Sequence, residues 1–294
     1  MSQISQPIYQ QCTVCGGTHR PLRYEWLFIC SQCGLLSSTL QPEIPFRAGT
    51  SIINEERRAW GLHDIRARNN AIILDAVVEQ FADGRSKRLL DVGSGLGFFL
   101  KDASDRGFAV LGIEPDANAV RRARETGIIV RHGYFPECLQ PEELFEVIVF
   151  NDVFEHVSRI VETLDACKKH LVQHGVLVLN CPSRTGIFYR LADVLDRLGI
   201  HGPFNRLWQR NMPSPHLWYF SPADLSRLGQ HQGLKTVKVM ELLPITLRGI
   251  THRIFNVRGQ SCPTGASALV ATFLLAPLLS ILPRDIGVVL LQKE

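Results

Sequence analysis

The sequence has little net charge and no dense Lys/Arg stripe interleaved with aromatic residues. Basic side chains exceed acidic ones by a net charge of +4, which gives no particular support to a nucleic-acid partner. The first ten residues, MSQISQPIYQ, have neither the basic start nor the apolar run of a secretory signal. We therefore expect a cytoplasmic protein whose thiols stay reduced. Internal repeats and low-complexity tracts are also absent from the sequence.

From residue 50 onward, apolar segments of strand length alternate with segments of helical periodicity. Strands are expected at 88–92, 109–114, 128–131, 147–150, 176–180, 234–243 and 286–292. Helices are expected at 50–82, 98–106, 118–126, 160–171 and after Ser221-Pro222. This alternation predicts an α/β fold with a doubly wound, mostly parallel seven-stranded sheet.

A glycine-rich loop follows the first of these strands, with the pattern D-x-G-x-G-x-G from Asp91 to Gly97. Glycines permit a sharp turn and let the backbone approach a ligand where a Cβ would clash. Glu114 ends the second strand, where a carboxylate can accept hydrogen bonds from ribose hydroxyls. The spacing differs from the G-x-G-x-x-G fingerprint of nicotinamide and flavin enzymes, which disfavours a dinucleotide. A tight turn without a ligand is the other alternative.

Several motifs together resemble one enzyme family. The glycine loop, the Glu114-Pro115 pair, NDVFEHV, LVQHGVLVLNCPS and PHLWYFSPADLSRLGQHQGL are similar to type 11 and type 23 methyltransferases of class I. The resemblance covers residues 65–242. It implies the class I methyltransferase fold, S-adenosylmethionine as the cofactor, and methyl transfer as the reaction.

The resemblance also implies roles for individual residues. The expected cofactor-binding residues are Asp91, Gly93, Gly95, Gly97, Glu114, Pro115, Tyr134, Phe135, Asn151 and Asp152. The family often has Gly-Asp after the third strand, where the carboxylate holds the adenine amino group, whereas this chain has Gly133-Tyr134-Phe135. We assign Tyr134 and Phe135 to the adenine pocket, with a role as core aromatics as the alternative.

Asp152, Glu155 and His156 follow the fourth strand at i, i+3 and i+4, which places them on one face of a helical turn. His216 lies in PHLWYFSP, just before a helix. One interpretation is purely structural. A second makes His156, His216 and Glu155 catalytic, with a histidine as general base for an oxygen acceptor. A third is a divalent metal held by these side chains, which resembles metal-assisted O-methyltransferases. Asp152 departs from the Glu usual in those enzymes.

Four of the eight cysteines fall within a short N-terminal segment. Cys12 and Cys15 form one C-x-x-C pair, and Cys30 and Cys33 form a second, with fourteen residues between the two pairs. This spacing is close to that of a zinc ribbon, in which four thiolates hold one structural Zn²⁺. We therefore expect a zinc ribbon at 1–46 and a methyltransferase domain at 47–294, with an unmetallated ribbon as the alternative. The other cysteines are expected to be buried.

Two inserts, at 183–215 and 243–283, occupy places where this fold builds a substrate cap. Both are apolar, and the first also carries Arg184, Arg190, Arg197, Arg206 and Arg210. This mixture predicts helical caps over a small-molecule or lipid-linked acceptor, with peripheral membrane contact as an option. Within the second insert, the uncharged run 259–283 favours a buried or membrane-surface helix over a span. An RNA methyltransferase and a catalytically silent scaffold are the competing functions.

Overall fold

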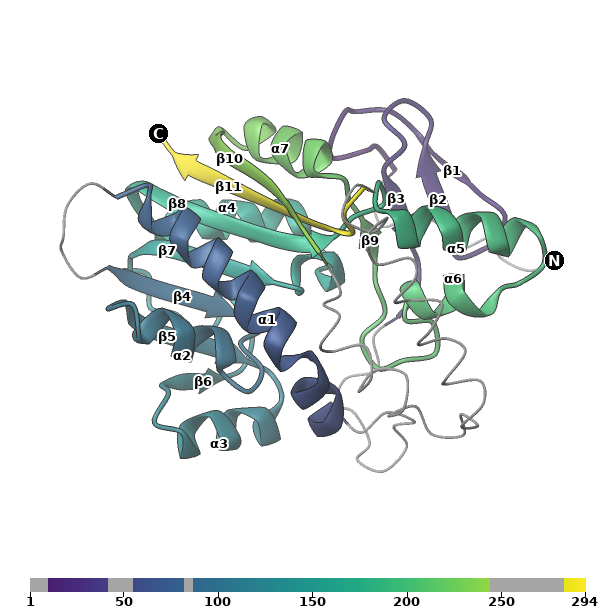
Figure 1. Cartoon of the computed structure of the whole chain (residues 1–294). Helices are drawn as coiled ribbons and strands as arrows, with labels where there is room; N and C mark the ends of the chain where they lie inside the picture. Colours follow the sequence, from purple (N-terminus) through teal and green to yellow (C-terminus); the bar gives the residue numbers. More distant parts are fainter. Residues whose placement is uncertain (1–9, 42–54, 82–86, 244–282) are drawn as a thin grey trace.

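The computed structural model describes residues 10–41, 55–81, 87–243 and 283–294, with the side chains of the first helix described from residue 65. The described strands form a seven-stranded sheet and a smaller four-stranded sheet beside it (Figure 1).

The larger sheet has the strand order β10-β11-β8-β7-β4-β5-β6. Its strands are β4 (Arg88–Val92), β5 (Ala109–Glu114), β6 (Val130–His132), β7 (Phe145–Asn151), β8 (Leu171–Pro182), β10 (Leu234–Leu242) and β11 (Ile286–Lys293). Strand β11 runs antiparallel between β8 and β10, and the remaining pairings are parallel. The predicted mostly parallel sheet of seven strands is confirmed.

Three strands differ from the prediction at their first residues. Strand β6 starts at Val130 rather than at residue 128, β7 at Phe145 rather than at residue 147, and β8 at Leu171 rather than at residue 176. The polar stretch Gln173-His174-Gly175 resembles a turn in the sequence. Strand β8 includes this stretch, and its pairing with β7 passes from Leu171 opposite Phe145 to Val176 opposite Val147, with a register shift between the two pairs.

Helices cover both faces of this sheet. On one face, α1 (Glu55–Val78), α2 (Phe98–Ser104) and α3 (Ala117–Glu125) contribute Ile73, Phe99 and Val120 to one core. On the other face, α4 (Ile160–His170) and α7 (Pro222–His231) contribute Leu164 and Leu225 to a second core. Helix α7 begins where predicted, because Ser221 and Asp224 form a capping box.

The N-terminal segment forms the smaller sheet together with a strand from far along the chain. Strands β1 (His19–Pro21), β2 (Leu27–Cys30) and β3 (Leu36–Ser38) are followed in the sheet by β9 (Trp218–Tyr219). The sequence did not predict β9, because two residues are too few for a periodic pattern. The N-terminal unit is therefore joined to the larger domain by backbone pairing, and the predicted boundary at 46 lies outside the described residues.

The first insert forms two helices, α5 (Ile187–Arg197) and α6 (Gly202–Leu207). Their side chains Tyr189 and Phe204 share a small core with Leu27 and Leu36 of the N-terminal sheet. The second insert, apart from its two end residues, lies outside the described residues, as does the run 259–282. No described helix is long and apolar enough to cross a membrane.

Candidate active site

The glycine loop connects β4 to α2 at the carboxyl edge of the sheet. Gly93, Gly95 and Gly97 have φ values of +73°, +53° and +79°, a region that L side chains rarely adopt. A Cβ on Gly93 would lie 2.6 Å from the Val153 side chain, whereas one on Gly95 would meet nothing within 4 Å. The loop therefore packs against the segment after β7 at Gly93 and is open at Gly95, where a ligand can approach the backbone.

Glu114, at the end of β5, is tied to this loop. Its Oε2 accepts the Gly95 N–H at 2.8 Å, and its Oε1 accepts the Asp116 N–H at 2.8 Å. Burial raises the pKa of Glu114, while these two N–H donors act in the opposite direction. Each carboxylate oxygen has a second lone pair for a ligand, and the role of Glu114 in binding ribose stays a prediction.

Two buried polar groups beside the loop lack hydrogen-bond partners among the described residues: Asp91 Oδ1 and Ser94 Oγ. Burial raises the pKa of Asp91 well above its usual range, and the neighbouring Glu114 carboxylate adds to the effect. A buried polar group without a partner costs about 1–3 kcal/mol. A polar ligand in the loop would satisfy these groups, which fits the expected cofactor.

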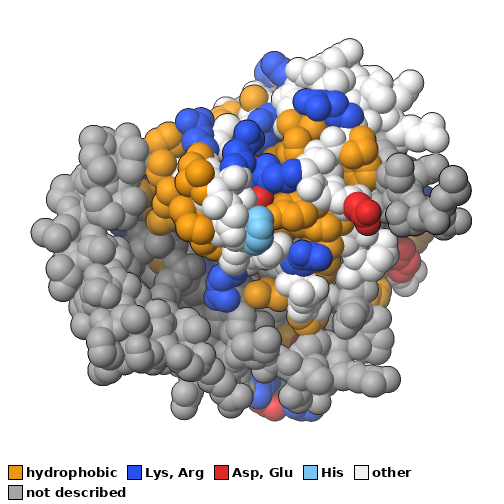
Figure 2. All heavy atoms as spheres, turned by 90° about the vertical axis from the view of Figure 1, so that its right-hand side faces the viewer, with side chains coloured by type: hydrophobic (Ala, Val, Ile, Leu, Met, Phe, Trp, Pro, Cys, Tyr) orange, Lys and Arg blue, Asp and Glu red, His pale blue; other side chains and the backbone are white. Residues whose placement is uncertain are grey.

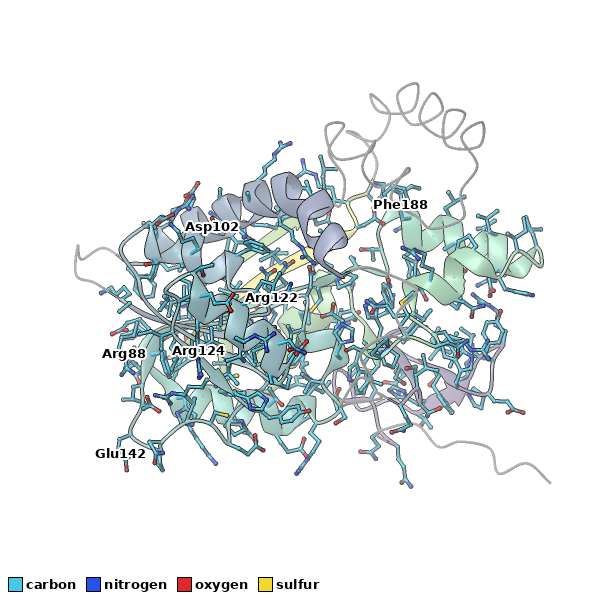
Figure 3. The ribbon with its side chains drawn as sticks, turned by 90° about the horizontal axis from the view of Figure 1, so that it is seen from below. Arg88, Asp102, Arg122, Arg124, Glu142 and Phe188 are labelled. Atoms are coloured by element: carbon cyan, nitrogen blue, oxygen red, sulfur yellow. The ribbon has the colours of Figure 1, made fainter. Side chains whose placement is uncertain are left out.

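Asn151 and Asp152 follow β7 and lie in a chain of amides. The Asn180 side chain donates to Asn151 Oδ1, and Asn151 Nδ2 lies 3.4 Å from Asn70 Oδ1 on α1. Asp152 has a φ of +57°, and its N–H donates to the Asn180 carbonyl at 2.9 Å. The amide chain continues to α2, where Asp102, which is labelled in Figure 3, accepts from Asn70 at 2.8 Å. Sequence reasoning missed Asn70, although two adjacent asparagines next to the apolar stretch 71–74 of this helix were an available signal.

The expected adenine-pocket residues divide into two environments. Tyr134 is 53% exposed, whereas Phe135 packs edge-on against Phe150 and His170 at centroid distances of 5.8 and 6.1 Å. The Pro115 carbonyl lies 3.0 Å from His132 Nε2. Phe135 thus contacts core aromatics, which was the alternative to its predicted role, and both assignments stay predictions.

Glu155, His156 and His216 come together although sixty residues separate the two histidines in the sequence. Glu155 and His156 lie on the short 3-10 helix η1 (Phe154–His156), and His216 precedes β9. One ligand atom from each of the three lies within 4.8 Å of the others, and the two imidazole centroids are 4.8 Å apart. We call these three residues the acceptor cluster. Asp152, the fourth predicted member, is not part of this group.

The hydrogen bonds of His156 define which ring nitrogen is basic. Its Nδ1 lies 2.9 Å from the Pro215 carbonyl and 3.1 Å from Ser214 Oγ. A carbonyl only accepts, so Nδ1 carries a proton, and in the neutral form of this imidazole Nε2 is the basic nitrogen. Nε2 lies 3.8 Å from Glu155 Oε1, so it points to the carboxyl group within the cluster.

Glu155 is almost completely buried, with 1% of its surface exposed. Burial raises its pKa well above the usual range, and the charge of Asp152 raises it further. Among the described residues, Glu155 Oε2 has no hydrogen-bond partner. A cation between Glu155 and the imidazoles would offset this cost, so the donor set fits a divalent metal as well as a proton.

The four N-terminal cysteines also come together. Their sulfur atoms lie within 4.8 Å of one another, with Cys12–Cys33 at 3.5 Å and Cys15–Cys30 at 3.4 Å, and all four are free thiols. A tetrahedral zinc site with Zn–S bonds of about 2.3 Å has sulfurs about 3.8 Å apart. The predicted grouping of these cysteines is confirmed, and its geometry fits one zinc ion.

Two features define a class I methyltransferase fold. One is the order of the seven strands, with one antiparallel strand next to the edge, and the other is the glycine loop after β4. Residues 63–239 match a family model described as a methyltransferase domain, that of type 23. The chain belongs to this methyltransferase family.

Named relatives match smaller parts of the chain. It is 39% identical over 111 residues to a ubiquinone biosynthesis O-methyltransferase of Paramagnetospirillum magneticum, covering 36% of this chain and 45% of that protein. It is 24% identical over 177 residues to the mitochondrial ubiquinone biosynthesis O-methyltransferase of Mus musculus, covering 56% and 46%. The chain spans about half the length of the curated relatives it matches.

Solved structures agree on the fold. An S-adenosylmethionine-dependent methyltransferase from Thermotoga maritima aligns with a TM-score of 0.51 at 17% identity, covering 82% of this chain and 95% of that one. The plantazolicin methyltransferase BpumL, solved with S-adenosylhomocysteine, aligns with a TM-score of 0.52 at 12% identity, covering 82% and 90%. At these identities the likeness establishes the fold alone.

Proposed function

We propose that this protein transfers a methyl group from S-adenosylmethionine to a hydroxyl oxygen of a small or lipid-linked, amphiphilic acceptor. The observation that carries the proposal is the contact between Gly93 and Val153, which brings the open glycine loop next to the segment that bears Glu155 and His156. A methyl donor in the loop would then face a basic cluster. The names of the O-methylating relatives support oxygen as the acceptor atom.

The donor side uses the residues around β4 and β5. In this proposal the loop from Asp91 to Gly97 binds the methionine and ribose parts, Glu114 binds ribose hydroxyls, and Asn151 and Asp152 line the pocket. Pro115, Tyr134 and Phe135 border the adenine. The chain's contribution to the reaction is mainly alignment, because an in-line displacement at the methyl carbon needs the acceptor oxygen opposite the sulfur.

The acceptor cluster removes the proton from the hydroxyl in one of two ways. With no metal, His156 Nε2 or His216 acts as the general base, because neutral imidazole is a base near pH 7. Alternatively, Glu155, His156 and His216 would hold a divalent cation, whose charge would lower the pKa of the acceptor hydroxyl. Activity that survives complete removal of divalent metals would leave the general base as the mechanism.

The test of the function measures methyl transfer from radiolabelled S-adenosylmethionine. Hydroxylated aromatic lipids, their short-chain analogues, simple amines and RNA serve as separate acceptors. We expect label in the aromatic lipids and its loss in His156→Gln. The matched control is His231→Gln, on α7. Label in RNA alone, or no binding of S-adenosylmethionine by calorimetry, would contradict the proposal.

We also propose that Cys12, Cys15, Cys30 and Cys33 hold one structural zinc ion. The close approach of their sulfur atoms supports this, and a short unit with little core gains folding energy from a metal. Elemental analysis of the purified protein is expected to give about one zinc per chain. Retention of that zinc in a variant lacking Cys12 and Cys33 would refute the assignment.

A third part of the proposal places a membrane surface at α5. Leu191 and Val194 of this helix and Leu198, the residue after its end, are 51%, 52% and 72% exposed. Arg190 and Arg197 are exposed on the same helix. Figure 2 shows hydrophobic and basic side chains interleaved on the side of the molecule that carries α5 and α6. Such a mixture suits the interface of an anionic bilayer.

Vesicle co-sedimentation tests this contact. Binding to vesicles with anionic lipid is expected to exceed binding to neutral vesicles and to fall in Leu191→Gln/Leu198→Gln. The control is Ile129→Gln, because Ile129 is 67% exposed next to β6 at the opposite edge of the sheet from β10. Equal binding by both variants would contradict a role for α5.

A further inference from the structure

The segment that carries His216 is held on both of its sides by other parts of the chain. On the inner side, the Leu217 N–H donates to the Glu155 carbonyl at 2.8 Å, which ties the segment to η1. On the outer side, Ser38 of β3 makes two contacts: its N–H donates to the Leu217 carbonyl at 2.8 Å, and its Oγ donates to the His216 carbonyl at 2.7 Å. The peptide of His216 is thus held between η1 and the cysteine-bearing unit.

The position of strand β3 depends on the turn that carries the second cysteine pair. Cys30 and Cys33 lie at the turn between β2 and β3, where the Cys30 N–H donates to the Leu35 carbonyl at 2.8 Å. Strand β3 then pairs antiparallel with β9, with Ser37 opposite Trp218 (Figure 1). A continuous path of backbone bonds therefore leads from the cysteine turn to the residue after His216.

We propose that the cysteine unit is a working part of the acceptor site, and that Ser38 is a positioning residue that holds His216 against Glu155 and His156. This inference rests on the proposed role of the acceptor cluster. Ser38 is fully buried, so its hydroxyl bond is not exchanged for water. A displacement of a catalytic group by about 1 Å can lower the reaction rate about a hundredfold, even when the mutation that causes it lies far from the reacting atoms.

Ser37 provides a matched control. It is the preceding residue of the same strand and is equally buried, but its Oγ pairs with His19 Nδ1 at 2.9 Å, within the N-terminal unit. Removal of either hydroxyl leaves one buried polar group without a bond. A purely structural effect would therefore be similar in both variants, whereas a positioning effect would follow Ser38 alone.

The experiment records imidazole resonances of full-length protein labelled with ¹⁵N-histidine, with the His156 and His216 signals assigned from His→Gln variants. We expect Ser38→Ala to shift or broaden the signals of His156 and His216, and Ser38→Thr, which keeps the hydroxyl, to restore them. Ser37→Ala is expected to change the His19 signal and to leave the other two in place. Cys33→Ser is expected to reproduce the Ser38→Ala pattern.

Calorimetry with S-adenosylmethionine serves as the independent readout. The glycine loop from Asp91 to Gly97, which binds the donor in the proposed function, is called the donor loop from here on. Ser38→Ala is expected to leave the affinity for S-adenosylmethionine unchanged, because the donor loop contacts Glu114 and Val153. Unchanged His156 and His216 signals in Ser38→Ala, or equal disturbance by Ser37→Ala, would overturn the inference. If Cys33→Ser fails to fold, the comparison of Ser38→Ala with Ser37→Ala tests the inference by itself. Failure of the wild type to bind S-adenosylmethionine would instead count against the proposed function, since the histidine signals still report on positioning.

Discussion

The donor loop and the acceptor cluster belong to the same edge of the sheet, but they are assembled in opposite ways. The donor loop is local: Gly95, Glu114 and Asp116 are linked by hydrogen bonds over about twenty residues of chain. The acceptor cluster is non-local, because His216, Glu155 and Ser38 come from three distant segments. The local site depends on backbone conformation, whereas the non-local one depends on every contact that holds its segments together.

Gly95→Arg should have the largest effect, because it breaks the local site directly. The substitution fills the open space at a left-handed position where the cofactor is expected to approach. We expect the affinity for S-adenosylmethionine to fall at least about 100-fold, or about 2.8 kcal/mol, as measured by calorimetry.

Gly107→Arg is the control for backbone strain. Gly107 has a φ of +87° and nothing within 4 Å of its Cβ position, but it lies between α2 and β5, after the loop. An equal loss of affinity in both variants would mean that strain, rather than occupancy of the loop, explains the result.

Cys33→Ser tests the non-local site, the acceptor cluster, through the cysteine unit that supports it. Loss of one ligand from the proposed zinc site should destabilise the N-terminal unit by about 3 kcal/mol and lower Tm by about 6–10 °C. The control is Cys138→Ser, since Cys138 lies apart from the other thiols, near the His132 carbonyl. Thermal unfolding with bound zinc measured alongside checks both variants, and equal Tm values would remove zinc as the support of this unit.

This difference in assembly also explains what the sequence could predict. The strand β4, its glycine loop and β5 are consecutive, so periodicity and glycine spacing located them to the residue. Ser38 and β9 carried no such signal, because two paired residues have no period and a serine in a strand is ordinary. The grouping of His156 with His216 was predictable only through family resemblance. Asp152 was predicted to join this cluster from helical spacing, but its φ of +57° is not helical, and the short helix η1 begins only at Phe154.

Two acidic side chains outside these two sites should also make stability depend on pH, with opposite signs. Asp285 Oδ1 accepts the N–H of Phe188 at 2.7 Å at the start of α5, and Phe188 is labelled in Figure 3. Burial raises the pKa of Asp285 to about 6, above its ordinary 3.8. The folded state therefore favours the protonated form, and stability is full below about pH 4 and is lost as the pH rises through about 6.

Asp285→Asn should remove this pH-dependent loss of folding stability. Asparagine keeps an acceptor for the Phe188 N–H without the buried charge, so we expect a gain of about 1–2 kcal/mol at pH 7 and no gain near pH 4. Urea unfolding at both pH values measures the difference. A gain that is the same at pH 4 would show that side-chain charge is not its cause.

Glu143 gives the opposite sign, with a smaller expected effect. Arg131 of β6 binds both of its carboxylate oxygens, at 2.6 and 2.8 Å, and the Gln140 N–H also donates to it. These contacts lower the pKa of Glu143 from 4.5 to about 2. Its stabilisation is therefore complete above about pH 4.5 and is lost as the pH falls towards 2.

Glu143→Gln should cost about 1 kcal/mol at pH 7, because the pair is partly exposed and solvent weakens it, and the cost should shrink as the pH falls below 4.5. Urea unfolding at pH 7 and pH 3 tests this, with Glu142→Gln as the control for an exposed neighbouring charge. The variant should leave the acceptor-cluster histidine signals unchanged, because β6 lies at the edge of the sheet beyond β5. A change in those signals would mean that the acceptor cluster is coupled to β6 through the sheet, and that it depends on more than the segments that touch it.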